Sequence, residues 1–153
     1  MEHPDLEYVG FWRRFAASLI DTVLLMPIVY ALAVMVYGPG YFIDTRLIKG
    51  GADFMISWVL PAVLVIWLWV IWSGQTPGKR VMGARIVDAE TGGPVSTKQA
   101  IIRYLGYYVS MLGLFIGFFW VGFDPKKQGW HDHMAGTVVV RKKASSTVTF
   151  AKG

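Results

Sequence analysis

The sequence contains no cysteine among its 153 residues, so disulfide bonds, cysteine-ligated metals and thiol catalysis are all excluded. Charged side chains are also scarce. They make up 16% of the chain, against about 25% in an average globular domain. Apolar residues reach 54% and aromatic residues 15%, which excludes an intrinsically disordered chain because disorder requires low hydrophobicity. The few charges are spaced unevenly and leave long uncharged runs, which indicates a membrane protein rather than a soluble domain.

Three apolar blocks stand out, the second and third without any charge and the first interrupted by Asp21, and each is long enough as a helix to cross a hydrocarbon core of about 30 Å. The blocks occupy residues 15–37, 54–72 and 104–123. We predict an all-α membrane protein, a helical bundle with membrane segments at about 11–37, 54–73 and 101–123. Residues 1–142 are expected to form a single membrane domain, and residues 143–153 a basic flexible tail.

The net charge of +5 serves here as an orientation signal, because Lys and Arg favour the cytoplasmic ends of membrane helices. Basic residues flank the first block at its start, lie between the second and third blocks, and follow the third. This distribution predicts an inner-membrane, multi-pass protein with both termini in the cytoplasm. The third block is then a broken or re-entrant segment, interrupted near Gly113 and Gly117. The alternative is a plain third crossing with an external C-terminus.

Two short β-strands support a returning third block. Residues 84–88 (ARIVD) and 137–141 (TVVVR) are rich in β-branched side chains, and residues 94–96 are a candidate return strand after a Gly-Gly turn. Strands this short are marginal alone. They can pair only if they lie on the same side of the membrane, so we expect a small cytoplasmic β element.

Asp21 lies inside the first apolar block, where a carboxylate is costly to insert into a bilayer. Arg14, Ser18 and Asp21 share one helical face, although Arg14 and Asp21 are about 10 Å apart along the axis. The carboxylate is therefore expected either to handle an ion or proton, or to fix the bundle by pairing with another segment.

The segment GQTPGKR at residues 74–80 has some likeness to a phosphate-binding loop, but it lacks the spacing and the Lys-Ser/Thr pair of a P-loop. We interpret it as a turn at the cytoplasmic end of the second span. Lys79 and Arg80 are expected to contact lipid phosphates there.

The segment WHDHMAGT at residues 130–137 places His131 and Asp132 next to each other. Adjacent side chains point in different directions on a helix or strand, which argues against a metal site. A structural role is favoured, and with a cytoplasmic tail Asp132 could reach Arg14 or Arg13.

Four segments together resemble the RDD family of small membrane proteins: GFWRRFAASLID, GQTPGKRVMGARIVDAETGGPVS, IIRYLG and FDPKKQGWHDHMAGTVVV. The family is named for one arginine and two aspartates. The resemblance assigns the arginine to Arg14, with Arg13 as the alternative, and the first aspartate to Asp21. It assigns the second to Asp132, with Asp124 as the alternative. It implies an integral membrane protein with a role in transport, since some relatives are associated with cation/proton antiport.

Two functions are consistent with these features. The first is a small membrane transporter or transporter subunit, exchanging a monovalent cation for a proton at Asp21 and forming a homo-oligomer. The second is a non-transporting structural or assembly factor of a membrane complex. We expect no enzymatic activity, no cofactor, no metal and no nucleic-acid partner, because the sequence offers no nucleophile–base pair and its basic residues flank the spans. The lipid bilayer is the expected surrounding.

Overall fold

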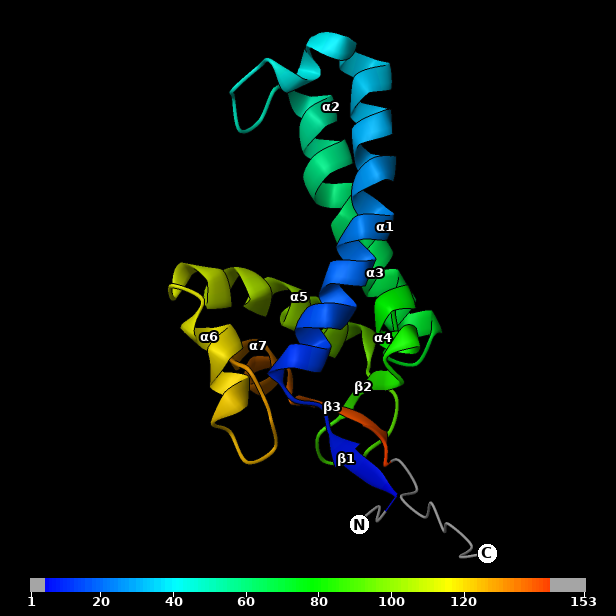
Figure 1. Cartoon of the computed structure of the whole chain (residues 1–153), viewed down its shortest axis with the longest axis vertical. Coiled ribbons are helices and arrows are strands. Elements are labelled where there is room, and N and C mark those ends of the chain that lie inside the picture. The colour runs from blue at the N-terminus through cyan, green and yellow to red at the C-terminus, as the bar shows by residue number, and fades with distance from the viewer. Residues whose placement is uncertain (1–4, 144–153) are drawn as a thin grey trace, which may run out of the picture.

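A computed structural model describes residues 5–143 and shows a helical protein with one small sheet (Figure 1). The predicted tail at 143–153 lies outside these residues except for Lys143. The elements in chain order are β1 (Leu6–Tyr8), α1 (Phe11–Tyr37), the 3₁₀ turn η1 (Pro39–Phe42), α2 (Gly51–Phe54), the π-helical turn η2 (Met55–Val59), α3 (Leu60–Ile71), α4 (Pro77–Val81), β2 (Ala84–Asp88), α5 (Thr97–Leu112), α6 (Ile116–Phe119), the 3₁₀ turn η3 (Trp120–Gly122), α7 (Trp130–Ala135) and β3 (Thr137–Lys142).

Two helical segments confirm the first two predicted apolar segments. Helix α1 has 27 residues, and α2, η2 and α3 form one continuous helix of 21 residues over Gly51–Ile71. At 1.5 Å per residue these reach roughly 40 and 32 Å, so both are long enough to cross a membrane. They lie side by side as a hairpin, with α1 continuous through Pro27. Large apolar side chains such as Met35 (81% exposed) and Val63 (57% exposed) cover its outer surface.

The third apolar block is broken. Its two parts, Thr97–Leu112 and Ile116–Gly122, are bent relative to each other by 115°. Gly113 ends α5, and Leu114 and Phe115 adopt left-handed backbone conformations with φ of 53° and 63°. The predicted break is therefore at Gly113 but not at Gly117. Gly117 lies within α6, where an added Cβ would come within 2.7 Å of Ser110 Oγ, so it serves close packing of α6 on α5. Helix α5 crosses the hairpin instead of running along it (Figure 1).

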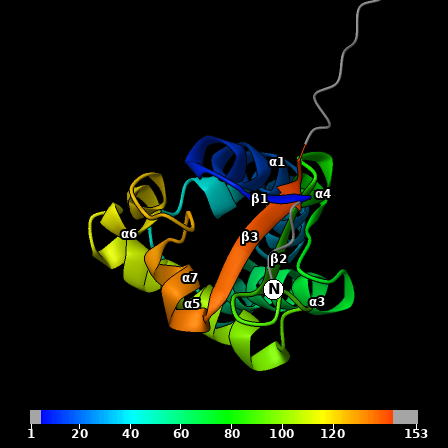
Figure 2. The same ribbon diagram turned by 90° about the horizontal axis from the view of Figure 1, so that it is seen from below.

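The sheet has the order β1–β3–β2, with both pairs antiparallel (Figure 2). The predicted strands pair with each other, and Ile86 lies opposite Val139 in that register. Strand β1 was not predicted. The expected return strand at 94–96 is reduced to a single bridge between Val87 and Pro94, because proline lacks the amide needed to extend a ladder.

The sheet is attached to the hairpin through a compact apolar core. Ile86 and Val139 are at most 1% exposed, and they cluster with Trp69 from the end of α3 and Ala100 from α5. Because β1 and β3 are neighbours, both ends of the described chain lie at the sheet, away from the loop that joins α1 to α2 (Figure 1). This geometry places the start and the end of the described residues, 5–143, on the same side of the hairpin.

Candidate functional site

Asp132 is the centre of a buried charge cluster at the sheet end of the hairpin. It lies in the first turn of α7 and is fully buried. Its Oδ2 is 2.5 Å from Nη1 of Arg14 on α1, and its Oδ1 pairs with Nη1 of Arg103 on α5. The backbone amide of Gly129 also donates to Asp132, at 2.9 Å. One carboxylate therefore joins α1, α5 and α7.

Both arginines make further contacts that fix their orientation. Arg14 donates from Nε to the carbonyl of Val9 at 2.8 Å and from Nη2 to the carbonyl of Lys127 at 2.5 Å. Arg103 donates to Thr137 Oγ1 at 2.8 Å, and its guanidinium lies 5.5 Å from the ring centre of Trp69. Arg13, the alternative to Arg14, is exposed and makes no side-chain hydrogen bond within residues 5–143. The cluster is therefore built on Arg14.

The charge states of the cluster follow from its surroundings. Burial raises the pKa of Asp132, but Arg103 and Arg14 outweigh it and hold that pKa below its usual range. Burial lowers the pKa of His131 to about 3, so its imidazole is neutral at physiological pH. His131 Nε2 lies 3.4 Å from Asp132 Oδ2, and its ring packs on Tyr107 with 4.6 Å between ring centres. His131 therefore acts as a neutral packing group beside a charged triad.

Asp21 does not join this cluster. Its Oδ2 accepts a hydrogen bond from Thr76 Oγ1 at 2.5 Å, and its Oδ1 accepts one from the backbone amide of Gly78 at 2.7 Å. Thr76 is also the N-cap of α4. An added Cβ at Gly78 would come within 2.0 Å of the carbonyl oxygen of Ala17, so only glycine permits this approach of α4 to α1. Asp21 thus links α1 to α4, while Asp132 links α1 to α5 and α7.

Lys79 is buried, which corrects the prediction that both basic residues of GQTPGKR lie on the surface of the turn. Its side chain is 8% exposed, and its Nζ lies 5.3 Å from the ring centre of Trp69. Burial lowers the pKa of Lys79 to about 8. Arg80 is exposed and stacks on Trp72 at 4.8 Å, which fits the predicted surface role. The difference arises because Pro77 begins a helical turn, in which consecutive side chains point about 100° apart.

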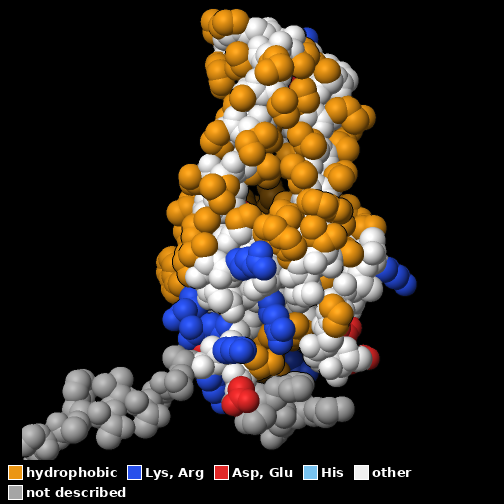
Figure 3. Space-filling view, turned by 90° about the vertical axis from the view of Figure 1, so that its right-hand side faces the viewer, with side chains coloured by type: hydrophobic (Ala, Val, Ile, Leu, Met, Phe, Trp, Pro, Cys, Tyr) orange, Lys and Arg blue, Asp and Glu red, His pale blue; other side chains and the backbone are white. Residues whose placement is uncertain are grey.

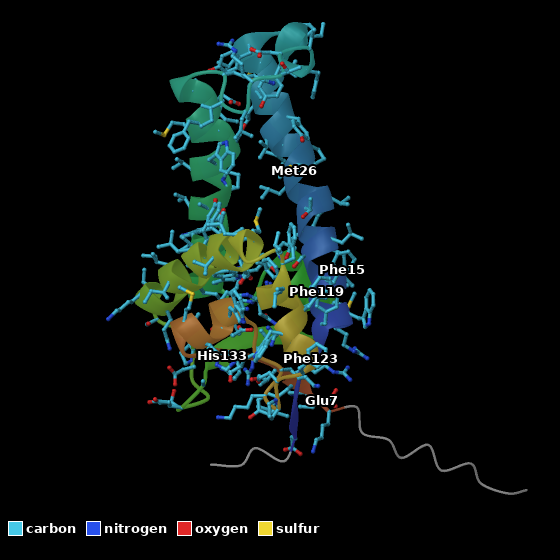
Figure 4. All side chains as sticks on the ribbon, turned by 90° about the vertical axis from the view of Figure 1, so that its left-hand side faces the viewer. Glu7, Phe15, Met26, Phe119, Phe123 and His133 are labelled. Atoms are coloured by element: carbon cyan, nitrogen blue, oxygen red, sulfur yellow. The ribbon has the colours of Figure 1, made fainter. Side chains whose placement is uncertain are left out.

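A cavity of about 620 Å³ lies between α1, α5 and α6 and reaches the charge cluster. Arg14, Lys79, Arg103 and His131 form its polar lining, and Ser18 from the exposed face of α1 also lines it. The rest of the lining is aromatic or aliphatic: Phe11, Phe15, Tyr107, Met111, Leu114, Phe115, Phe118, Phe119, Val121 and Val139. Phe15 comes from α1 and Phe119 from α6; both are labelled in Figure 4, and Phe119 also stacks on Phe11 of α1 with 5.1 Å between ring centres. The cavity is thus cationic at one end and aromatic at the other.

Asp124, the alternative to Asp132, has a local role. Its Oδ2 accepts hydrogen bonds from the amides of Lys126 and Gln128, and its Oδ1 is 3.1 Å from Nε2 of the half-exposed His133. It therefore orders the loop before α7 without reaching Arg14. No group of three His, Cys, Asp or Glu side chains within residues 5–143 is arranged to hold a metal ion.

Arg103 is the main residue that the sequence reasoning missed. It is 2% exposed and shares one buried face of α5 with Ala100, Gly106 and Ser110. These positions follow helical spacing, and an arginine among small residues on one helical face indicates close contact with a neighbouring helix. Gly106 completes the face, because an added Cβ there would come within 2.8 Å of the Cα of His131. This close packing brings α5 and α7 near enough for Arg103 to reach Asp132.

Comparison with known proteins confirms the predicted family. The model of the RDD family matches residues 8–136. The membrane protein YteJ of Bacillus subtilis is 30% identical over 142 residues, covering 89% of this chain and 82% of that protein. YxaI of the same organism is 31% identical over 160 residues, covering 93% of this chain and all of that protein. A proline-rich antigen of Mycobacterium leprae is 27% identical over 92 residues, covering 58% of this chain and 37% of that protein. No solved structure matches this chain. With the family model extending over most of its length, this chain belongs to the RDD family.

Proposed function

We propose that α1 and the helix over Gly51–Ile71 cross the cell membrane, with the sheet, α7 and both chain ends in the cytoplasm. The distribution of charge supports this orientation. Lys and Arg side chains gather at the sheet end, and hydrophobic side chains cover the hairpin (Figure 3). Positive charge is favoured at the cytoplasmic side of a membrane. At the far end, Arg46 is neutralised locally by Asp44, at 2.7 Å.

In this arrangement α5 and α6 lie along the inner membrane interface instead of crossing. Their outward side chains are strongly apolar at the bend, where Leu112 is 85% exposed and Leu114 is 81% exposed. The start of α5 carries Lys98, which is exposed. A helix with one apolar face and a polar end is typical of segments that lie in the interface.

Within this frame, the protein serves as a non-transporting structural or assembly factor of a membrane complex. The observation that carries this proposal is the lack of polar side chains through the middle of the hairpin. Residues 23–29 of α1 are all apolar, and the only polar side-chain groups of residues 58–71 are indole N–H groups. At 1.5 Å per residue these stretches amount to roughly 10 and 20 Å of helix with no site for an ion or proton to occupy.

The buried contacts suit a scaffold. Asp132 joins three helices through Arg14 and Arg103, and Asp21 joins α1 to α4, so the hairpin and its cytoplasmic part are held as one body. In each long helix only 11% of the residues in its most apolar stretch are buried. These surfaces remain available to lipid, to helices of another protein or to a second copy of this chain.

Vesicle flux measurements test whether the protein transports ions. Purified protein in vesicles with an internal pH-sensitive dye should leave a pH gradient unchanged when Na⁺ or K⁺ is added, as in protein-free vesicles. Monovalent cation/proton exchange remains a prediction of the resemblance. Exchange that appears with the unmodified chain and disappears in Asp21→Asn would overturn the non-transporting proposal and establish Asp21 as the ion-handling group.

Crosslinking in native membranes tests the assembly role. A photoreactive amino acid at Val23 or Val63, which are 64% and 57% exposed on the hairpin, should give a protein adduct of one reproducible mass. The same group at exposed Lys98 is the matched control and should give little of that adduct. Lipid adducts alone at both hairpin positions would contradict an assembly role. An adduct of twice the chain mass would identify a homo-oligomer.

A further inference from the structure

The cavity between α1, α5 and α6 has a charge distribution that the scaffold role does not require. Arg14, Lys79 and Arg103 line it, whereas their nearest acids do not: Asp132 is fully buried behind the arginines, and Asp21 is turned toward Thr76. Three positive and two negative charges leave a net charge of +1 (3 − 2). No carboxylate within residues 5–143 lines the cavity, so its interior attracts an anion.

Two of these cations have donors without partners in residues 5–143. Arg103 is 2% exposed and its Nε is buried with no hydrogen bond. Lys79 is 8% exposed, and its ammonium group makes neither a hydrogen bond nor an ion pair there. A buried donor left unpaired destabilises the fold, so such groups are normally satisfied. Both residues line the cavity. Arg103 Nε itself is closed off by burial, so the unpaired donor that an anion in the cavity can reach is the Lys79 ammonium.

The opposite end of the cavity is apolar and open. Leu114, Phe115 and Phe119 line it and are 81%, 54% and 56% exposed. Phe15 on α1 is 53% exposed and lines the same cavity (Figure 4). In the proposed orientation this rim lies in the inner leaflet. A molecule with an apolar chain can thus approach the cationic end without leaving the membrane.

We propose that this cavity binds the phosphate group of an anionic membrane phospholipid, whose fatty chains lie along the aromatic rim. The planar guanidinium of arginine suits phosphate oxygens, and the lysine ammonium adds a point charge. The volume of about 620 Å³ lies within the usual range of small-molecule sites. A zwitterionic lipid is disfavoured, because its ammonium group would face the same three cations. This site does not depend on whether the protein transports ions or assembles a complex.

Native mass spectrometry of the whole chain tests the proposal. Protein in maltoside micelles is titrated with dioleoyl phosphatidylglycerol and, separately, with dioleoyl phosphatidylcholine. We expect one tightly retained phosphatidylglycerol and at least tenfold weaker retention of phosphatidylcholine. Lys79→Gln should weaken phosphatidylglycerol binding about tenfold or more, since charge-assisted contacts are stronger than neutral ones. Arg80→Gln is the matched control, because it removes the same charge from the neighbouring exposed residue and should change binding less than twofold.

A second pair of variants keeps the test decisive if Lys79→Gln does not fold. Ser18 lines the cavity from the exposed face of α1, so Ser18→Glu places a negative charge in it with little effect on packing. Ser18→Glu should abolish phosphatidylglycerol retention, and Ser18→Gln should preserve it. Equal retention of the two lipids, or equal losses in Lys79→Gln and Arg80→Gln, would overturn the proposal. Displacement of the lipid by millimolar inorganic phosphate would show a site for free phosphate instead.

Discussion

Replacing Asp132 by asparagine tests whether the charge cluster stabilises the fold. The change keeps the size of the side chain and an oxygen that can accept from the Gly129 amide, but it removes the negative charge. Arg14 and Arg103 then face each other without a counter-ion, and Lys79 lines the same cavity. The perturbation is therefore almost purely electrostatic.

The expected loss is large because the carboxylate is fully buried and contacts both guanidinium groups. Removing one partner of a buried ion pair costs about 3–5 kcal/mol. We expect Asp132→Asn to lower the free energy of unfolding by this amount. A loss of about 3 kcal/mol is already more than a hundredfold in the ratio of folded to unfolded protein.

Unfolding in mixed micelles with increasing dodecyl sulfate, followed by circular dichroism, measures this free energy. Asp124→Asn is the matched control: Asp124 is 12% exposed and pairs with the half-exposed His133, so its loss should stay below about 1 kcal/mol. The double variant Asp132→Asn/Arg103→Met should be more stable than Asp132→Asn alone, because it removes one of the unpaired cations.

The pH dependence gives an independent check. Because the pKa of Asp132 is below its usual value of 3.8, the carboxylate stays ionised throughout pH 5–8. The stability difference between the unmodified chain and Asp132→Asn should be constant over that range. It should shrink only in acid, as the pH falls below 3.8 toward the folded-state pKa. If Asp132→Asn lowers the free energy of unfolding by less than about 1 kcal/mol at neutral pH, or by no more than Asp124→Asn does, the charge cluster does not stabilise the fold as argued.

Three further predictions concern other parts of the molecule. Gly78→Ala should destabilise the protein by about 1–3 kcal/mol, because the added Cβ would come within 2.0 Å of a backbone oxygen of α1. Gly122→Ala is the control: nothing lies within 4 Å of its added Cβ, so the same titration should show a change below about 0.5 kcal/mol. The pKa of His131 is about 3 in the folded protein, against its ordinary value of 6.5, so below pH 6.5 the unfolded chain binds a proton that the folded chain does not. Stability should therefore decrease as the pH is lowered below 6.5, by up to about 1.4 kcal/mol per pH unit. His131→Gln should remove that dependence. Because the chain has no native cysteine, Leu47→Cys and Glu90→Cys each carry a single thiol, and a membrane-impermeant maleimide should label the first in intact cells and the second only after lysis. The opposite labelling pattern would reverse the proposed orientation, and labelling of both in intact cells would reject the two-crossing arrangement.

Much of the architecture follows from local features of the sequence. The apolar blocks predicted the two long helices, because length and composition alone decide whether a helix can cross a hydrocarbon core. The β-branched run TVVVR predicted β3, and the shortness of the two strands predicted that they pair, which the ladder from Ala84 to Asp88 confirms. Gly113 predicted the break in the third block.

Part of the site followed from the resemblance to the RDD family. It assigned the arginine to Arg14 and the second aspartate to Asp132, with Arg13 and Asp124 as alternatives. In the structure Arg14 and Asp132 pair in the buried cluster, whereas Arg13 is exposed and Asp124 pairs with His133. Arg13 and Arg14 point about 100° apart on their helix, so only one of them could face the bundle.

The sequence by itself determined the apolar hairpin and the strand pair, because these depend on composition and short-range periodicity. The tertiary structure alone decided how the charges are partnered. Arg14 and Asp132 are 118 positions apart, and Asp21 and Thr76 are 55 apart, so no local pattern links them. It also decided that Lys79 turns inward and that Arg103 keeps an unpaired donor beside a cavity, since both depend on where three separate helices meet.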